Sequence, residues 1–481
     1  MEKFLAVNER CRLWSIPYEF SIDEQLIGEV KLALHEFWFH PDPCVSSFNQ
    51  LFHCGRAGPG ASVKARAPDF YTKMFDSPLS ATNDLHFVWE RMCEQAPLWA
   101  EASRQQRWSR SSFVAESSNY SFVNKTTTIA RGTCTEPSVN MWFQLGLGEC
   151  LNRRLKKVYN YDPALQPDRN RVMARRGSLD GSLSTIDLES ASDSMSLHVL
   201  KEILPASFFG WLKILRCHQT TTPQGELVEL NMVSTMGNGF TFPLQTLLFH
   251  SVVKSAYRLL GIPLNMGRRD VEGCNDPFAV SRNFSVFGDD IIVDTRAVRL
   301  VLRGLYLLGF KVNEDKTFVE GPFRESCGAD YVNGVNVRGV YIKSLNTQQD
   351  VFVAINTLNR WSAKTGVSLP ETLDILLRAI PNPHGRLTPP DEDDAAGIHA
   401  PVSIACLYNP LVRKNYGRHD HRNTHVNLRP YKASVPILRY MEILDGFIRV
   451  DVEGARPRNY NPSGLMLAGL AGHIRGGKIS L

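Results

Sequence analysis

A short segment with two adjacent carboxylates, placed between two apolar runs, constrains the fold of this chain most. The runs are Phe284-Ser285-Val286 and Ile291-Ile292-Val293, and the segment between them is Phe287-Gly288-Asp289-Asp290. Apolar, β-branched runs that flank a short glycine-containing turn are typical of a β-hairpin. We therefore predict a hairpin over residues 284–293, embedded in a core sheet, with concentrated negative charge at its tip.

A third carboxylate follows another apolar run, Leu183-Ser184-Thr185-Ile186, which ends at Asp187. If this run is a strand beside the hairpin, Asp187 lies near Asp289 and Asp290. Because side chains alternate along a strand, we expect Asp289 to be the principal metal ligand and Asp290 to assist. Three carboxylates around two divalent ions can catalyse phosphoryl transfer. The plainer interpretations are a solvated hairpin tip and, for Asp187, a turn or helix-capping residue.

The length and composition indicate a folded protein with more than one core. The chain has 481 residues, of which 43% are hydrophobic and 21% charged. Single cores stop growing beyond roughly 250–300 residues, so we expect two or three lobes. Ten cysteines occur without a CxxC pair, which predicts reduced thiols instead of a zinc site or a disulfide framework. No uncharged apolar run approaches the ~20 residues that span a bilayer, so we expect no membrane partner and a cytoplasmic location.

The net charge of +5, from 54 basic and 49 acidic residues, does not by itself identify a nucleic-acid partner. Basic residues do cluster in four segments, 104–110, 153–157, 169–176 and 413–429, and aromatic residues are interleaved in the first and the last of them. Such runs are more often solvated faces, but four of them together favour a groove for a polyanion.

The distribution of periodic segments predicts an α+β fold. Helical periodicity covers residues 22–39, 85–99 and 140–157, whereas residues 119–135 have strand-like sequence. Between residues 182 and 345 the pattern predicts a strand (182–188), helices (191–204 and 239–260), the hairpin and a further helix (297–308). This alternation suggests helices packed on one face of a sheet. After about residue 345 we expect mainly helices.

A loop before the predicted helix over 239–260 carries polar groups suited to binding. In Ser234-Thr235-Met236-Gly237-Asn238-Gly239-Phe240-Thr241, two glycines flank Asn238 and allow close backbone approach. Asn238 and Thr241 supply neutral hydrogen-bonding groups for a sugar hydroxyl or a template strand. An ordinary helix-start loop explains this segment equally well.

Taken together, five segments of this chain resemble the replicases of the levivirids, which are small positive-strand RNA bacteriophages. In matching order and spacing, the segments are 187–193, 234–242, 287–290, 313–318 and 321–328. The resemblance implies a right-hand polymerase with fingers, a palm in which an antiparallel sheet packs on helices, and a mainly helical thumb. It places the N-terminal region and fingers in 1–176, the palm in 177–345 with inserted finger elements at about 205–283, and the thumb and C-terminal region in 346–481.

The resemblance also implies roles for the acids and for one lysine. Asp187, Asp289 and Asp290 would hold two Mg²⁺ ions, with Mn²⁺ able to substitute. One ion would activate the primer 3′-hydroxyl, and the other would hold the triphosphate and stabilise the departing pyrophosphate. Lys316 aligns with the palm lysine that acts as a general acid toward pyrophosphate. Phe287 replaces the usual tyrosine, so only a hydroxyl is lost.

Further residues align with the nucleotide-binding positions of the family. Lys125 and Arg131 match basic residues of the fingers that lie over the incoming triphosphate. Asp193, together with Asn238 or Thr241, matches residues that select ribose through its 2′-hydroxyl.

The function implied by the resemblance is RNA-directed RNA polymerase activity that replicates a single-stranded, positive-sense RNA phage genome. Its partners would be RNA template and product, nucleoside triphosphates, and the host elongation factors Tu and Ts with a host ribosomal protein, in the cytoplasm of the infected bacterium. One alternative is a reverse transcriptase-like polymerase, which shares the acids but usually places a bulky side chain where this chain has Ser192, Asp193 and Asn238. Another is a non-catalytic RNA-binding protein, against which the intact acids argue.

Overall fold

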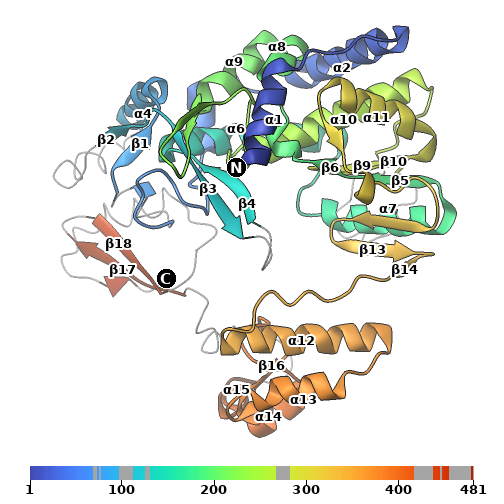
Figure 1. The fold of residues 1–481 in the computed structure, drawn as a ribbon. Coiled ribbons are helices and arrows are strands. Elements are labelled where there is room, and N and C mark those ends of the chain that lie inside the picture. The colour runs from blue at the N-terminus through green and yellow to red at the C-terminus, as the bar shows by residue number, and fades with distance from the viewer. Residues whose placement is uncertain are drawn as a thin grey trace. The chain divides into compact units, whose positions relative to one another are not determined.

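The computed structural model describes residues 1–68, 73–74, 77–96, 112–124, 130–266, 282–416, 437–444, 447–453 and 478–479. Within them, helices combine with several small sheets, mostly antiparallel, which confirms the α+β class (Figure 1). The described residues fall into two compact units, a larger one from Met1–Val123 and Arg131–Arg338 and a smaller one that consists mainly of residues from Gly339 onward and also includes Asn124 and Ala130. The division into fingers, palm and thumb at residues 176 and 345 stays a prediction, and Lys125 lies outside the described residues.

The helices of the larger unit largely follow the periodic segments of the sequence. They are α1 (Glu2–Leu13), α2 (Ser21–Phe39), α3 (Phe48–Cys54), α4 (Asn83–Gln95), α6 (Ser138–Tyr159), α7 (Gln166–Asp180), α8 (Leu197–Ile203), α9 (Ala206–Leu215), α10 (Thr241–Leu259) and α11 (Val298–Leu307). The predicted helices over 22–39, 140–157, 239–260 and 297–308 are confirmed as α2, α6, α10 and α11. After α11, Gly309 adopts φ +85°, a conformation that suits glycine and ends the helix.

The prediction of one helix over 191–204 is wrong in its first half. The chain instead forms a short 3₁₀ helix, η2 (Ala191–Asp193), and begins α8 only at Leu197. Ser190 adopts a left-handed conformation with φ +49°, and its carbonyl accepts a hydrogen bond from Ser194 Oγ at 2.8 Å. Serine side chains that bond to nearby backbone compete with helix formation in this way.

The larger unit contains a three-stranded antiparallel sheet. Its strands are β5 (Leu183–Ile186), β10 (Asp290–Asp294) and β9 (Phe284–Phe287), in the order β5-β10-β9. β9 and β10 are joined by a two-residue turn at Gly288 and Asp289, since Phe287 pairs with Asp290. Most residues of these strands are buried. The predicted hairpin in a core sheet is therefore confirmed.

Helices cover both faces of this sheet, so the expectation of helices on one face only is wrong (Figure 1). On one face, Met173 and Ala174 of α7 pack against Leu183 and Ile292. On the other face, α10 contacts β9, where the ring of Tyr257 lies 6.1 Å from that of Phe284. The consecutive apolar residues of β10 explain the difference, because strands buried on both faces lack the apolar–polar alternation of one-sided sheets.

The remaining strands form separate sheets of two to four strands. In the larger unit they are β1 (Leu79–Ala81) with β2 (Ser112–Val114), β6 (Leu188–Glu189) with β11 (Lys311–Val312), β12 (Phe323–Ser326) with β13 (Ala329–Val332) and β14 (Val335–Asn336), and a four-stranded sheet of β4 (Ala130–Thr135), β3 (Ser118–Asn124), β7 (Gln219–Thr221) and β8 (Leu227–Glu229). Of the residues 119–135 predicted to be strand-like, β3 and β4 confirm 119–124 and 130–135, and 125–129 lie outside the described residues.

The smaller unit is helical at first and then forms strands. Its helices are α12 (Gln348–Thr365), α13 (Pro370–Arg378), α14 (Val402–Tyr408) and α15 (Pro410–Tyr416), and its strands are β15 (Leu387–Thr388), β16 (Ile398–His399), β17 (Ile437–Leu444), β18 (Phe447–Glu453) and β19 (Lys478–Ile479). The prediction of mainly helices is thus wrong for 437–444 and 447–453, where β-branched and aromatic residues favour strands. Among the described helices of the whole chain, none combines the length and apolarity that a bilayer crossing needs.

Candidate active site

The pairing of β5 with β10 brings acids from distant parts of the sequence to one edge of the sheet. Ile186 pairs with Ile291, so Asp187, the next residue after Ile186, and Asp290, the residue before Ile291, lie at the same end of these antiparallel strands. Asp289 is in the adjoining turn. The structure therefore places the three predicted metal-binding acids next to one another.

Asp187 is held by the segment that follows β11. Asn313 donates from Nδ2 to Asp187 Oδ2 at 2.7 Å and from its backbone N–H to the Asp187 carbonyl at 3.0 Å. Thr317 Oγ1 accepts a hydrogen bond from the Asp187 N–H at 3.3 Å. Burial raises the pKa of Asp187, Asn313 and the nearby charge of Lys316 lower it, and the charge of Asp290 raises it again. Lys316 is thus an exposed cation within electrostatic range of Asp187.

The orienting role of Asn313 was not foreseen from the sequence, although Asn313 stands in one of the segments that carry the resemblance. Its contact with Asp187 joins residues far apart in the chain. Neither the residue types nor their spacing in the sequence predicts such a contact.

The carboxylate of Asp290 points toward the turn between β12 and β13. Its Oδ1 accepts hydrogen bonds from Ser326 Oγ at 3.2 Å and from the Cys327 N–H at 3.1 Å. Ser326 Oγ in turn accepts from Nδ2 of the buried Asn170, in α7, at 3.1 Å. One oxygen of Asp290 is therefore engaged by protein donors, and the assisting role of Asp290 stays a prediction.

Asp289 is exposed at the tip of the hairpin. Desolvation by surrounding protein raises its pKa, the charges of Asp290 and Asp187 raise it further, and Arg131 of β4 lowers it. The three acids therefore repel one another. Arg131 is close enough for its positive charge to stabilise the ionised form of Asp289. A bound cation at this position would relieve the repulsion.

The donor set suits a hard cation. No group of three or more His, Cys, Asp or Glu side chains in the described part of the chain is arranged to hold a metal ion by itself. Mg²⁺, however, usually binds through only one or two carboxylates and completes its shell with water and substrate phosphates. Asp187 and Asp289 offer such oxygen ligands, so the residues present fit Mg²⁺ bound together with a nucleotide.

The hairpin tip is fixed from behind by α10. Gly288 adopts φ +60°, and a Cβ atom there would lie 2.4 Å from Cε2 of Phe242. The Gly288 N–H donates to Thr246 Oγ1 at 3.1 Å, and the rings of Phe242 and Phe287 meet edge to face at 4.8 Å. Both the backbone conformation and the lack of space require glycine at this position.

Asn238 and Thr241 are buried and mainly stabilise the loop that contains them. Asn238 Oδ1 accepts hydrogen bonds from the Thr235 N–H at 2.8 Å and from Thr235 Oγ1 at 3.0 Å. Thr241 Oγ1 donates to the Thr235 carbonyl at 3.0 Å. Within the described residues, the Asn238 amide nitrogen has no hydrogen-bond partner, so it is a donor available to a ligand.

Asp193 lies against the same loop. Its Oδ1 accepts a hydrogen bond from the Met236 N–H at 3.0 Å, and its carbonyl accepts one from Cys11 Sγ at 3.5 Å. Burial raises the pKa of Asp193 to about 6, although the Met236 N–H opposes this shift. The structure therefore brings Asp193 to the loop of Asn238.

The raised pKa of Asp193 predicts a pH-dependent difference in stability. Since its pKa is about 6 in the folded protein and near the ordinary 3.8 when unfolded, the folded state binds this proton more tightly. This contribution to stability is complete below about pH 4 and is lost as the pH rises through about 6. We expect the stability of Asp193→Asn relative to wild type to rise by about 2 kcal/mol between about pH 4 and about pH 7. Urea denaturation of both proteins across this pH range measures this change. A difference in unfolding free energy that stays constant with pH would contradict the raised pKa of Asp193.

A protein-family model described as RNA replicase, beta-chain matches residues 45–445. The chain is 31% identical to the RNA-directed RNA polymerase subunit beta of Enterobacteria phage SP over 87% of this chain and 69% of that protein. It is 38% identical to the RNA-directed RNA polymerase beta chain of Escherichia phage MS2, over 53% of this chain and 43% of that protein. A crystal structure of a human picorbirnavirus RNA-dependent RNA polymerase with its insertion loop deleted aligns with a TM-score of 0.36 and 13% identity, over 55% of this chain and 57% of that one.

Proposed function

Because this chain belongs to the RNA replicase beta-chain family of RNA-directed RNA polymerases, we propose that it replicates a single-stranded, positive-sense RNA phage genome by two-metal-ion nucleotidyl transfer. The observation that carries this proposal is the register of β5 and β10, which brings Asp187 beside Asp289 and Asp290. In this proposal the sheet β5-β10-β9 is the palm, the sheet that contains β4 belongs to the fingers, and the helices α12–α15 belong to the thumb.

The proposed roles follow from the surroundings of each residue. Asp187 and Asp289 hold Mg²⁺, for which Mn²⁺ can substitute, and Asp290 steadies the tip through the β12–β13 turn. When bound, the two cations stabilise negative charge on the attacking and leaving oxygens. Lys316, exposed near Asp187, would give a proton to the departing pyrophosphate. Arg131, near Asp289, would attract the incoming triphosphate.

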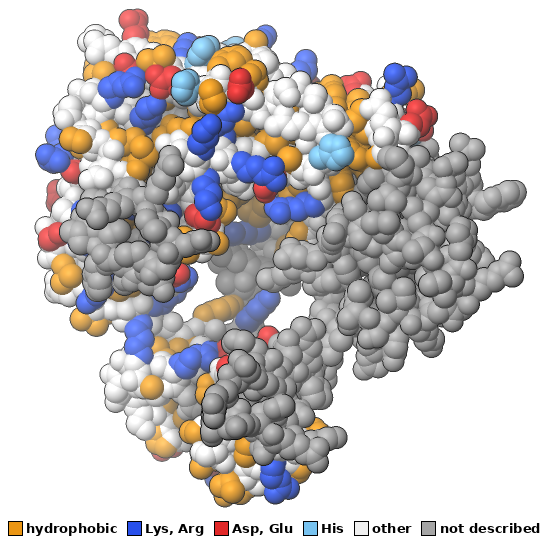
Figure 2. All heavy atoms as spheres, turned by 180° about the vertical axis from the view of Figure 1, so that it is seen from behind, with side chains coloured by type: hydrophobic (Ala, Val, Ile, Leu, Met, Phe, Trp, Pro, Cys, Tyr) orange, Lys and Arg blue, Asp and Glu red, His pale blue; other side chains and the backbone are white. Residues whose placement is uncertain are grey.

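The partners proposed from the family are RNA template and product, nucleoside triphosphates, host elongation factors Tu and Ts and a host ribosomal protein, in the cytoplasm of the infected bacterium. Figure 2 shows lysine and arginine side chains gathered in the middle of the larger unit's face. Such a concentration of positive charge suits an RNA backbone, whose binding then weakens as salt increases.

The assignment to RNA synthesis predicts a preference for ribonucleotides. On an RNA primer and template, we expect incorporation of ribonucleoside triphosphates to exceed that of deoxyribonucleoside triphosphates by roughly 10²-fold or more, because buried polar groups reject a ligand that leaves them unpaired. Asp193→Asn should narrow this ratio, whereas Asp168→Asn, at an exposed residue of α7, should not. Single-nucleotide extension rates measure both.

Preference for deoxyribonucleotides would instead identify a reverse transcriptase-like polymerase. RNA binding without any incorporation, in the presence of Mg²⁺ and host factors, would identify the non-catalytic alternative.

A further inference from the structure

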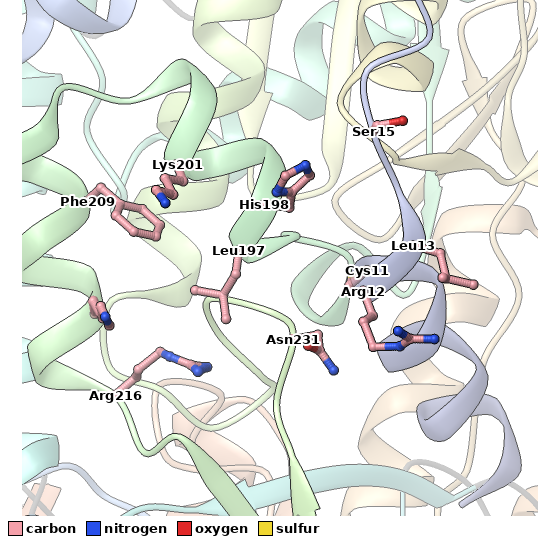
Figure 3. A pocket seen from close by; sticks show the side chains of 11 residues that line it. Cys11, Arg12, Leu13, Ser15, Leu197, His198, Lys201, Phe209, Arg216 and Asn231 are labelled. Carbon is pink, nitrogen blue, oxygen red and sulfur yellow. The ribbon is translucent and has the colours of Figure 1, made fainter.

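A second candidate site lies away from the acids, between the N-terminal helix and two helices that follow η2. It is a pocket of about 450 Å³. Its lining comes from α1 and the residues after it, from α8 and α9, and from residues next to β7 and β8 (Figure 3). Volumes of this size are typical of small-ligand pockets. None of the acids of the candidate active site lines it.

The charged side chains of this pocket are all basic. Lys201 and Lys213 are exposed and have no ion-pair partner within the described residues, and His198 lies beside them. Arg12 also lines the pocket and forms an ion pair with Glu9. No Asp or Glu contributes to the lining. The pocket therefore presents positive charge that the protein only partly compensates.

A buried arginine adds to this charge. Arg216 is 4% exposed, and its terminal nitrogens donate to the carbonyls of Leu230 and Met232 at 2.7–3.2 Å. Its Nε atom is buried with no hydrogen-bond partner in the described part of the chain. Its pKa is lowered to about 10 by burial, which the charge of Glu136 opposes. Among the described residues, the Arg216 guanidinium hydrogen-bonds to backbone carbonyls and to no carboxylate, and Glu136 is an acid whose charge acts on it.

Apolar groups lie between the basic ones. Figure 3 shows Phe209 close to Lys201, with Leu197 and Asn231 between them and Arg12. Phosphate groups bind to lysine and arginine, whereas bases stack on aromatic and apolar side chains. A nucleotide carries both a phosphate, which basic side chains bind, and a base, which stacks on aromatic and apolar side chains.

We propose that this pocket binds a nucleoside phosphate, either free or as one unit of an RNA strand, with the phosphate at Lys201 and Lys213 and the base against Phe209 and Leu197. Asp187, Asp289 and Asp290 do not line this pocket, and the proposal does not depend on their chemistry. The proposed contacts all come from α8 and α9.

Photo-crosslinking of the full chain tests the proposal. The probes are a short oligouridylate that contains 4-thiouridine and, separately, 8-azido-ATP, and the labelled peptides are mapped by mass spectrometry. We expect labelling of the segment 197–213 by one or both probes, and the responding probe distinguishes the strand from the free nucleotide. The double variant Lys201→Ala, Lys213→Ala should reduce that labelling by about tenfold, since hydrogen bonds to charged groups are lost.

The matched control is Arg56→Ala, Arg299→Ala, which removes two exposed cations of the larger unit that do not line the pocket. It should leave the labelling unchanged. Absence of labelling in 197–213 with both probes, or equal labelling of the two double variants, would overturn the proposal. Asp289→Asn should abolish nucleotide incorporation and preserve the labelling, so failure of the pocket and failure of the proposed polymerase function give different results.

Discussion

Asp289→Asn should reduce nucleotide incorporation by roughly 10³-fold or more while the protein remains folded. The substitution keeps the size of the side chain and removes the charge that a divalent cation needs. Asp289 is exposed at the hairpin tip, so its replacement leaves no buried group without a partner. It also removes one of three mutually repelling carboxylates, so stability should not fall. Extension of a radiolabelled RNA primer with saturating Mg²⁺ measures the effect.

The matched control for this experiment is Asp315→Asn. Asp315 is an exposed acid of η4 (Glu314–Lys316), next to Lys316, and has no ion-pair partner among the described residues. Its replacement changes net charge equally and should leave incorporation within about twofold of wild type. Equal activity of Asp289→Asn and Asp315→Asn would show that the hairpin acid has no part in the reaction.

Arg324→Met should lower the free energy of unfolding of the larger unit by about 3–5 kcal/mol. Arg324 is 1% exposed and donates from Nε to the Leu183 carbonyl at 2.6 Å. Its terminal nitrogens donate to carbonyls of the segment before and within β12, among them Val319 at 2.9 Å and Gly321 at 2.8 Å. Methionine fills similar space but leaves these buried carbonyls without donors.

Urea denaturation of Arg324→Met and of Arg299→Met separates this loss from a general effect of losing an arginine. Arg299 is exposed on α11 and makes no ion pair in the described part of the structure. We expect its replacement to change stability by less than about 0.5 kcal/mol. Equal midpoints for the two variants would mean that the contacts of Arg324 do not stabilise the β5 end of the sheet.

Local patterns were sufficient to predict the hairpin, because its turn and its apolar flanks are adjacent in sequence. The pairing of β5 with β10 was only a hypothesis, since nothing within residues 183–187 specifies a partner so distant in the chain. The same limit applies to Asn313, Ser326 and Arg324, whose roles arise from contacts with remote backbone or carboxylate groups. Tertiary contacts of this kind override local propensity and leave no periodic signal.

Two further differences between the predicted and the observed fold arise from side-chain hydrogen bonds that hydrophobic periodicity does not reveal. The break before α8 depends on the left-handed conformation of Ser190 and on the bond from Ser194 to its carbonyl. The covering of both sheet faces depends on α7, whose buried Gln166 and Asn170 bond to β9 or β10 at 2.5–3.3 Å. Polar residues on a buried helix face weaken the apolar period that would otherwise predict its packing.

The most direct test of the central claim is anomalous diffraction from crystals of the full chain with RNA, a nucleotide and Mn²⁺. We predict anomalous peaks for manganese ions that have the carboxylates of Asp187 and Asp289 among their ligands. The Asp290 carboxylate should still accept hydrogen bonds from Ser326 and Cys327. Manganese bound to the nucleotide but with neither Asp187 nor Asp289 among its ligands, in a protein that still extends the primer, would contradict the account.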